Sequence, residues 1–419
     1  MRAALALALL ALAVAVLYWA PLRRLRAALG LAHLVGTGHA FLVFGAIIGL
    51  ALGDEHHQLS ADVAPIVGFV AGWVGFAVGM RFDHRVLRTV PPRAWGMALA
   101  PALAAAAAVA AASLGILLAV AIRPVEALAA ALVLGAAAAS SGPTLVAVLR
   151  TRRAGRATGV RADLKLIELS AGVDDLLVIL LATLAFSLLR PAAEAFTHGV
   201  FTLASLFGGV LLGLITWLFL GGRATDDERL LLGVGMLMFS AGCAAWLHLS
   251  PASVAAVAAI ILVNLPGDRG HRLFEVVRRV ERPAVVILMT FMGFSAVGSL
   301  SWVLWPLVAA MTLLRALAKL LAGAAVAGPI PTTHGVVAGR RWALGLVPQG
   351  TLGLMIVVTF FGVWDDATAR TVLAAVAVAS LLNELVAPWL LLRVARDASV
   401  APPAPAPAVA DRTPKRGAT

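Results

Sequence analysis

Apolar runs of about 20 residues recur along almost the whole chain, and a run of that length crosses a bilayer as one helix. No other feature limits the possible folds as strongly. Hydrophobic residues make up 61% of the sequence and charged residues 13%, against roughly 45–50% and about 25% in soluble domains. The sequence therefore predicts an all-α polytopic membrane protein. It argues against a soluble enzyme, a nucleic-acid binder and, because Cys243 is the only cysteine, a disulfide scaffold.

The positions of the runs predict about thirteen transmembrane helices. They are expected at 3–21, 33–53, 60–80, 95–121, 125–149, 166–189, 199–220, 230–248, 252–266, 283–299, 302–326, 342–363 and 369–392. The span at 252–266 is the weakest, because it is short and begins directly after Pro251. The run at 3–21 could instead be a signal peptide. The run ends with Tyr18, Trp19 and Pro21 in place of a small-residue cleavage site, so we expect a retained span.

The basic residues, which give the chain a net charge of +12, sort into alternate loops. Cytoplasmic loops of membrane proteins are rich in Lys and Arg. One set of loops, together with the C-terminal tail, holds nearly all of them, and the opposite set holds only Arg2, Arg123, Arg190 and Arg370. The distribution of Lys and Arg therefore predicts the orientation of the chain in the membrane, with the N-terminus outside and the C-terminus in the cytoplasm. We expect an integral protein of a bacterial inner (plasma) membrane, with a disordered cytoplasmic tail at 400–419.

Several ionisable residues fall within or at the edge of a predicted span, where a charge is costly. They are Glu168, Asp174, Asp175, Arg315, Lys319 and Glu384. Such residues usually face a cavity or one another. One acid and one base would suffice for a static ion pair that holds the bundle together. Adjacent acids point about 100° apart on a helix, so one can hold a base while the other faces a cavity and takes a proton or a cation.

Arg315 and Lys319 lie one helical turn apart on the same face, so either can be the partner of Asp174. Lys319 is the only lysine within a predicted span, and a buried lysine can lose its proton, whereas arginine stays charged. This favours a role for Lys319 in proton release; chance use of lysine is the simpler alternative. Glu168 lies seven residues before Asp175, on nearly the same face. It either lines an inward funnel or is an interfacial surface acid.

Two predicted spans are interrupted by Gly and Pro at membrane depth. The fifth contains Ser140-Ser141-Gly142-Pro143-Thr144, and the twelfth contains Pro348-Gln349-Gly350. Proline breaks a helix, and non-helical backbone at this depth survives only beside a cavity or within protein. One break can be a simple kink. Two breaks in equivalent halves, each followed by a span with an acid, predict inverted repeats with two crossed, broken helices around a binding site.

At these segments the sequence resembles the monovalent cation/proton antiporter superfamily, and most of all its sodium/proton antiporter branch with an intramembrane Asp-Asp pair. The similarity rests on Ser140-Ser141-Gly142-Pro143-Thr144, Gly172-Val173-Asp174-Asp175, Arg315-Ala316-Leu317-Ala318-Lys319 and Gly345-Leu346-Val347-Pro348-Gln349-Gly350. The resemblance implies a homodimer in membrane lipid and exchange of Na⁺, K⁺ or Li⁺ for protons in pH homeostasis. It implies one transmembrane domain at 1–399, whose core helices (about 95–190 and 302–392) move against dimerisation helices formed by the remainder.

By position, the resemblance makes Asp175 the carboxylate that takes up the transported Na⁺ or other cation, and the proton. Asp174 would pair with a base, Lys319 in preference to Arg315. Ser140, Ser141 and Thr144 would add oxygen ligands, and Glu384 and Glu168 would be accessory acids. The sequence departs from the family where relatives often have a threonine and an acid: it has Ser141-Gly142 and Gln349-Gly350. These departures concern the identity of the cation more than the transport class.

These residues predict a secondary active transporter, and not an enzyme, that needs no cofactor besides its transported ions. Exchange would be electrogenic if Lys319 releases a second proton for each cation. The alternatives are a sodium-coupled organic-anion symporter, a cation channel of similar architecture, and an intramembrane aspartyl hydrolase. The hydrolase needs two acids that converge from different helices, and the adjacent Asp174 and Asp175 point apart.

Overall fold

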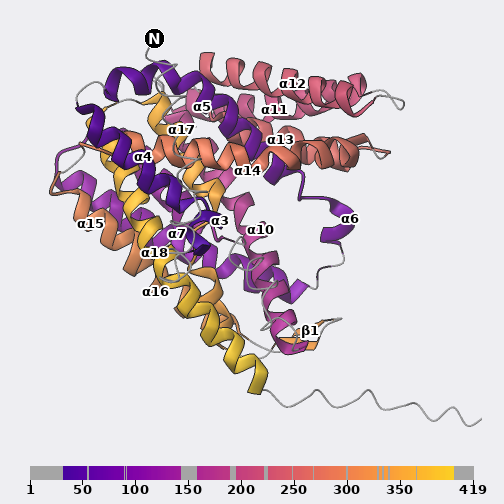
Figure 1. The fold of residues 1–419 in the computed structure, drawn as a ribbon, viewed down its shortest axis with the longest axis vertical. Helices are drawn as coiled ribbons and strands as arrows, with labels where there is room; N and C mark the ends of the chain where they lie inside the picture. The colour runs from indigo at the N-terminus through magenta and orange to yellow at the C-terminus, as the bar shows by residue number, and fades with distance from the viewer. Residues whose placement is uncertain are drawn as a thin grey trace, which may run out of the picture.

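The computed structural model describes residues 32–53, 56–88, 90, 92–142, 158–188, 195–220, 225–247, 249–267, 269–298, 301–327, 330–332, 335–337, 340–364 and 366–400. These parts are nearly all helical (Figure 1). Seven of the described helices are long and apolar enough to cross a membrane, judged by length and composition, and further apolar helices are shorter. The span expected at 3–21, the break residues Pro143 and Thr144, and nearly all of the expected tail lie outside the described residues.

The helices pack into two groups. The first group consists of α3 (Ala32–Gly36), α4 (His39–Leu52), α5 (His56–Gly79), α11 (Ala195–Phe219), α12 (Asp226–Trp246), α13 (Pro251–Asn264) and α14 (Arg269–Ser295), with the short α6 (His84–Leu87) after α5. Its closest pairs are α5 with α13 and α4 with α14. Small residues allow this approach: a Cβ on Gly293 of α14 would overlap the carbonyl of Leu42 in α4.

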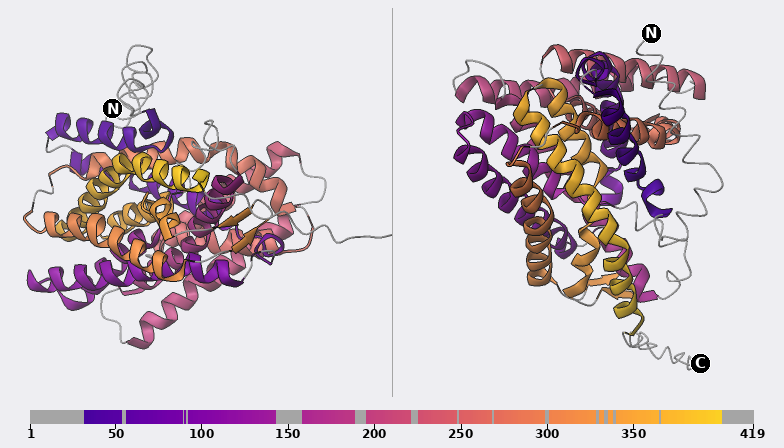
Figure 2. Two further views of the ribbon diagram at one scale, coloured as in Figure 1. Left: turned by 90° about the horizontal axis from the view of Figure 1, so that it is seen from below. Right: turned by 60° about the vertical axis from the view of Figure 1, so that its left-hand side comes forward.

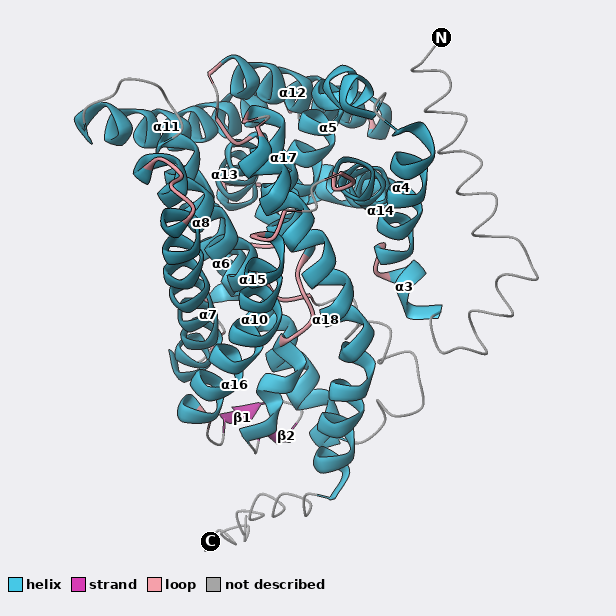
Figure 3. Cartoon of the chain, turned by 90° about the vertical axis from the view of Figure 1, so that its left-hand side faces the viewer, coloured by secondary structure: helices cyan, strands magenta, loops and turns pink. Residues whose placement is uncertain are grey.

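The second group contains both interrupted helices. It consists of α7 (Pro92–Ala119), α8 (Pro124–Ala139), α10 (Thr158–Leu188), α15 (Leu304–Ala309), the π-helical turn η3 (Ala310–Leu314), α16 (Arg315–Val326), the 3-10 helix η4 (Arg340–Leu346), α17 (Thr351–Val363) and α18 (Ala367–Val400). In Figures 1 and 3, α7, α10, α16 and α18 run side by side, at a steep angle to α11 and α12 of the first group. The right-hand view of Figure 2 shows α18, in yellow, extending along most of the molecule.

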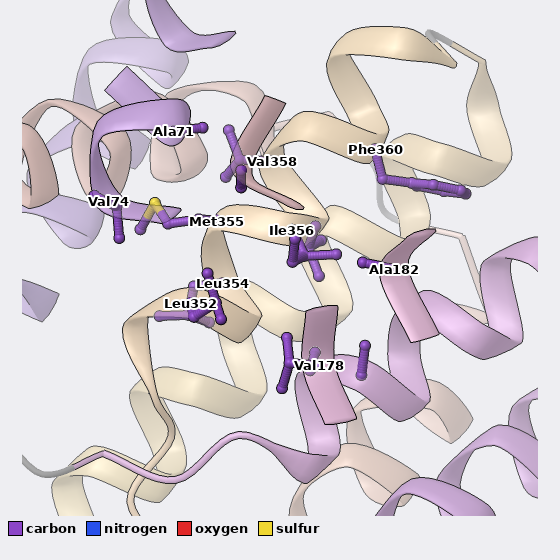
Figure 4. Close-up of a cluster of buried hydrophobic side chains, with 14 of the residues drawn as sticks. Ala71, Val74, Val178, Ala182, Leu352, Leu354, Met355, Ile356, Val358 and Phe360 are labelled. Atoms are coloured by element: carbon purple, nitrogen blue, oxygen red, sulfur yellow. The ribbon is translucent and has the colours of Figure 1, made fainter. Parts of the chain in front are cut away.

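The element α17 joins the two groups. Every residue from Leu352 to Phe361 is buried. The helix packs on α5 of the first group and on α8, α10 and α18 of the second. Figure 4 shows its side chains Met355 and Val358 directed toward Val74 and Ala71 of α5, and Ile356 toward Ala182 of α10. A helix that is apolar on all sides is one that is surrounded by protein or lipid, which explains the continuous run of apolar residues here.

Local signals in the sequence explain where several helices begin. At the start of α12, Thr225 and Glu228 form a capping box, in which the Thr225 hydroxyl accepts from the backbone N–H of Glu228 and the Glu228 carboxylate accepts from that of Thr225. Ser250 caps α13 in the same way, by accepting from the backbone N–H of Ser253. Pro251 then occupies the first helical turn, where proline lacks only an N–H that would be unpaired.

Each predicted span after the first overlaps at least one described helix. Residues 143–149 of the fifth span lie outside the described part of the chain, and the eleventh and twelfth spans are each divided over several elements. Two helices extend beyond their predicted spans at charged segments: α14 begins at Arg269, well before 283, and α10 begins at Thr158, although its apolar part, Leu166–Leu188, agrees with the span predicted at 166–189. The first half of α14 is amphipathic, with Leu273, Val276 and Val277 buried between charged residues, so a search for apolar runs misses it. A hairpin between α16 and η4 interrupts the all-α pattern: β1 (Ile330–Thr332) pairs antiparallel with β2 (Gly335–Val337).

Candidate functional site

The first broken helix ends in an extended segment. The helix α8 finishes at Ala139, and Ser140 is extended, with φ of −60° and ψ of 132°. Gly142 lies two residues further on, and the backbone there leaves the helical path before the expected Pro143. Ser140 and Ser141 are 0% and 2% exposed, so this non-helical backbone lies inside the protein, as its membrane depth requires.

The second broken helix meets the first at this point. The segment between η4 and α17 is extended up to Gly350, which has φ of −78° and ψ of 149°. Gln349 and Ser141 form an antiparallel bridge. The N–H of Gly142 donates to the carbonyl of Pro348 at 2.8 Å, and that of Gly350 donates to the carbonyl of Ser140 at 3.4 Å. The two breaks therefore satisfy each other's freed backbone groups. We call residues 140–142 together with 348–350 the crossing.

Arg315 binds the backbone of both broken helices. Its guanidinium is fully buried and donates to the carbonyls of Ala138 at 2.9 Å and Ser140 at 2.7 Å. It also donates to the carbonyls of Val347 and Pro348 on the other segment. The last carbonyls of a helix have no partner within the helix and carry a partial negative charge. Arg315 therefore compensates two helix ends at once, and its hydrogen bonds go to carbonyls and not to a carboxylate.

Lys319 lies one turn further along α16 and reaches the acids. Its ammonium group, which is also fully buried, donates to the carbonyl of Ala139 at 2.7 Å and to the Ser141 hydroxyl at 2.6 Å. It lies 3.9 Å from Oδ2 of Asp174. Of the two candidate bases, the structure thus places Lys319 at ion-pair distance from Asp174.

The two aspartates of α10 differ in their surroundings. Asp174 is 1% exposed, and its Oδ1 has no hydrogen-bond partner among the residues that the structure describes. Asp175 is 5% exposed, and its Oδ1 accepts a hydrogen bond from the Ser140 hydroxyl at 3.4 Å. A buried polar atom without a partner is expensive. The unpaired oxygen of Asp174 and the weakly bonded carboxylate of Asp175 therefore form a site that can take up a cation or a proton.

The crossing supplies the oxygens and charges that such an ion needs. Hydroxyls of Ser140 and Ser141 stand beside the two carboxylates. The end of α8 favours a positive charge, and the start of α17 at Thr351 favours a negative one. Gln349 strengthens the crossing, since its amide Nε2 donates to the carbonyl of Ala137 at 3.1 Å. Among the described residues, no group of three or more His, Cys, Asp or Glu side chains is arranged to hold a metal ion.

The two other predicted acids lie away from the crossing. Glu384 is buried in α18, where its backbone carbonyl contacts His33 of α3. Glu168 lies on α10 and is partly exposed. Asn383, which precedes Glu384 in α18, donates a long hydrogen bond of 3.5 Å to the carbonyl of Met311.

The sequence does not single out an ion pair that faces the site from the first group. Arg81, directly after α5, pairs with Glu281 of α14, and both charges lie within electrostatic range of Asp175. The prediction assigns Arg81 to a cytoplasmic loop on account of its charge, and Glu281 lies outside the predicted span at 283–299. Glu281 can pair with Arg81 because α14 is already helical from Arg269 onward. The apolar pattern does not predict this earlier start.

Two comparisons with known proteins found matches to this chain. A family model described as "Sodium/hydrogen exchanger, transmembrane" matches residues 11–393. A solved structure, that of the sodium proton antiporter MjNhaP1 from Methanocaldococcus jannaschii at pH 8, is similar, with a TM-score of 0.59 and 16% sequence identity over 94% of this chain and 100% of that chain. At that identity the likeness shows the fold alone. No curated protein sequence matches the chain significantly.

The match to the family model extends over all of the elements that form the crossing, from α8 to α17. It also includes both aspartates and both buried bases. The structure contains the crossed breaks that the sequence predicts, and its overall fold is similar to that of a sodium proton antiporter. The chain belongs to the sodium/hydrogen exchanger family, a family of cation/proton antiporters and not of enzymes.

Proposed function

We propose that the chain exchanges Na⁺ for protons, and that both ions compete for the carboxylate of Asp175. One observation carries the proposal: two adjacent buried acids stand beside the crossing, and the only described lysine there engages one of them. Lys319 lies near Asp174, while Asp175 receives one hydrogen bond from the described residues, that of Ser140. Asp175 is thus the acid that remains for an ion.

A Na⁺ ion at Asp175 would find the oxygen ligands that a hard cation requires. The Ser140 hydroxyl already contacts this carboxylate. The hydroxyl of Ser141, the carbonyls of the crossing and, by sequence position, Thr144 would complete the ligand set. A bound cation requires an ionised carboxylate, and a bound proton neutralises it. Because one group cannot carry both ions, each passage in one direction is coupled to a passage of the other ion in return.

Lys319 would supply a second proton. Its ammonium stands between the crossing and Asp174, and a buried lysine can lose its proton. If Na⁺ arrival at Asp175 displaces a proton from Lys319 as well, two protons move against one cation, and the exchange is electrogenic. K⁺ and Li⁺ share the preference for oxygen ligands and are the competing candidates for the transported cation.

Alternating access would follow from movement of the second helix group, as the core, against the first. The two groups meet along α17, which packs on α5, and along α10, which packs on α11 and α13, with a smaller contribution from α18 against α14. Large apolar side chains of α11 and α12 are exposed, among them Leu218, Leu231 and Trp246, and would face lipid or a second protomer of a homodimer. The proposed orientation in the plasma membrane is the one that the loop charges predict, with the C-terminus in the cytoplasm.

The test is a proton-flux assay in proteoliposomes that carry a pH-sensitive dye and an imposed proton gradient. Addition of Na⁺ should release protons from the vesicles in a saturable manner, and Asp175→Asn should abolish the response. Asp227→Asn, an exposed acid at the start of α12, is the matched control and should behave like the wild type. Parallel additions of K⁺ and Li⁺ rank the cations. Full activity in Asp175→Asn would overturn the proposal, as would absence of any cation-driven proton flux.

A further inference from the structure

An ion pair of the first helix group faces the site from outside it. Arg81, just after α5, donates a hydrogen bond to the carboxylate of Glu281 in α14. The pair is partly exposed: 36% of the Arg81 side chain and 20% of the Glu281 side chain are accessible to solvent. Ion pairs that solvent reaches contribute little to the stability of a fold. Stability alone therefore does not account for this pair.

The backbone that carries the pair is packed firmly within the first group. A Cβ on Gly79 would overlap the carbonyl of Ala256 in α13, so the end of α5 lies directly against that helix. Trp73 of α5 donates from its Nε1 to the carbonyl of Val277 at 3.1 Å, which joins α5 to the first half of α14. The two charges therefore move with the first group and not with the ion site.

Asp175 belongs to the second group but lies close to the pair. The helix α17 packs on both α5 and α10, and Val74 of α5 and Val178 of α10 belong to one buried apolar cluster (Figure 4). Asp175 lies one turn before Val178, and Arg81 lies two turns after Val74. Because α5 runs toward the cytoplasm in the predicted orientation and α10 runs away from it, both charges lie on the cytoplasmic side of this cluster. The arginine acts on Asp175 more strongly than its glutamate partner does.

Other charges near Asp175 travel with it. Lys319 of α16 and the adjacent Asp174 are parts of the second group, so movement of that group keeps their distances to Asp175. Arg81 and Glu281 are parts of the first group, so the same movement changes theirs. This ion pair can therefore make the electrostatic potential at Asp175 differ between the two states of the cycle.

Coulomb's law gives the sign of the effect on a bound cation. The guanidinium repels a cation at Asp175, and arginine keeps its charge over the whole physiological pH range. The carboxylate of Glu281 attracts the cation and offsets part of the repulsion. We propose that Arg81 weakens the binding of Na⁺ when the site faces the cytoplasm, that Glu281 limits this effect, and that the chain therefore binds Na⁺ more weakly on its cytoplasmic side than on the other.

The inference rests on the proposed function, because it requires movement of the second group past the ion pair. Its consequence concerns the rate of exchange. A low affinity on the cytoplasmic side keeps the site unsaturated at low internal Na⁺. The exchange rate would then rise with the internal concentration of the cation.

The test compares the KM for Na⁺ on the two faces of the membrane. Na⁺-driven proton flux is measured in inside-out vesicles, which expose the cytoplasmic face, and in right-side-out vesicles, at alkaline pH so that protons compete little for Asp175. In inside-out vesicles, Arg81→Gln should lower the KM at least about three-fold and Glu281→Gln should raise it by a similar factor. The double variant should return toward the wild type. In right-side-out vesicles, the KM of all three should stay within about two-fold of the wild-type value.

Two further variants separate the effect of charge from that of structure. Arg81→Lys keeps the positive charge and should keep the wild-type KM. Arg272→Gln removes an exposed charge elsewhere on α14 and is the matched control. Arg81→Gln and Glu281→Gln both break the ion pair, so a purely structural role would shift the KM in the same direction in both. That result would overturn the inference, as would equal shifts on the two faces.

A binding measurement keeps the inference separate from the proposed function. Stabilisation of the purified protein by Na⁺ against thermal unfolding reports the dissociation constant without transport. Arg81→Gln should tighten this binding and Glu281→Gln should weaken it. A wild type without cation-driven flux would refute the proposed function, and the opposite shifts in binding would still decide the role of Arg81. A wild type with flux, whose two variants bind Na⁺ equally well, would refute this inference alone.

Discussion

At the scale of single residues, the site separates two bases that the sequence cannot tell apart. Arg315 and Lys319 occupy one face of α16, a turn apart, and both are fully buried. The planar guanidinium of Arg315 spreads its donors over carbonyls from two chain segments, which suits its fixed fork of N–H groups. The compact ammonium of Lys319 binds one carbonyl and one hydroxyl and stands near a carboxylate. The contacts of Arg315 thus hold the two broken helices together, whereas those of Lys319 place a positive charge near Asp174.

Substitution of Lys319 tests whether its charge takes part in exchange. We expect Lys319→Gln to retain Na⁺/H⁺ exchange at a reduced rate but to lose the second proton, so that transport falls from about one net charge per Na⁺ to about zero. The measurement is the effect of an imposed membrane potential on Na⁺-driven proton flux. Lys319→Arg is the matched comparison, since it keeps the charge but does not release a proton. An unchanged response to the potential in Lys319→Gln would show that the lysine is only structural.

The sequence predicts the ionisable residues of the site better than their contacts. Asp174, Asp175, Arg315 and Lys319 stand out because charges are rare in the spans, and all of them meet at the crossing. Their hydrogen bonds could not be predicted, because the partners are mainly backbone carbonyls, which every residue has. Which carbonyls are free depends on where each helix stops, and that depends on how the two breaks pair.

At the scale of elements, the crossing is the feature that positions the site. Gly350 is in an ordinary extended conformation, so its importance comes from space and not from its dihedral angles. A Cβ at this position would overlap the Ser140 hydroxyl and crowd the carbonyl of Ser141 at 2.7 Å. The same Ser140 hydroxyl bonds Asp175. The close approach of the two breaks and the geometry of the proposed ion site are therefore linked by one atom.

We expect Gly350→Ala to weaken both stability and ion binding. Overlap of this kind typically costs about 1–3 kcal/mol, and a displaced Ser140 should raise the KM for Na⁺. Thermal unfolding in detergent and Na⁺-driven proton flux measure the two effects. Gly362→Ala, near the end of the same α17, is the control, because a Cβ there has no neighbour within 4 Å. Equal stability and equal KM in the two variants would mean that the crossing is looser than the structure indicates.

Elements were predictable from the sequence wherever burial makes a whole run apolar. The buried helices α13 and α17 fall within or next to their predicted spans because nearly every side chain faces protein or lipid. The first half of α14 was not predictable, since its charged face breaks the run while Leu273 and Val277 are buried. The β1–β2 hairpin is likewise too short for a period-two pattern, with three residues in each strand.

At the scale of the whole molecule, the two helix groups are each tightly packed and meet along fewer elements. Close glycine contacts join α4 to α14 within the first group, whereas the second is organised around α8 and the crossing. The main contacts between the groups involve α17, which packs on α5, α13 and α14. Since the residues of the proposed ion site all belong to the second group, movement of that group as a unit would carry the ion without dismantling its ligands.

A cross-link between the groups should therefore stop exchange. Phe291 of α14 and Phe361 of α17 face each other across the boundary, with ring centroids 6.3 Å apart. Cysteines at these two positions, in a Cys243→Ser background, can be joined by a short thiosulfonate reagent. If the groups move against each other in every cycle, the cross-link should reduce Na⁺-driven proton flux by at least about ten-fold, as expected when a required conformational step is blocked, and a reducing agent should restore it.

The matched pair for this experiment lies within the second group. Phe186 of α10 and Phe360 of α17 have ring centroids 6.1 Å apart, almost the same separation, and both are buried. Joining these two positions should leave exchange largely intact, because α10 and α17 belong to the unit that moves as one. Inhibition by both cross-links would indicate that α17 shifts against α10, so that the crossing itself rearranges. Inhibition by neither would exclude movement at the boundary between α14 and α17.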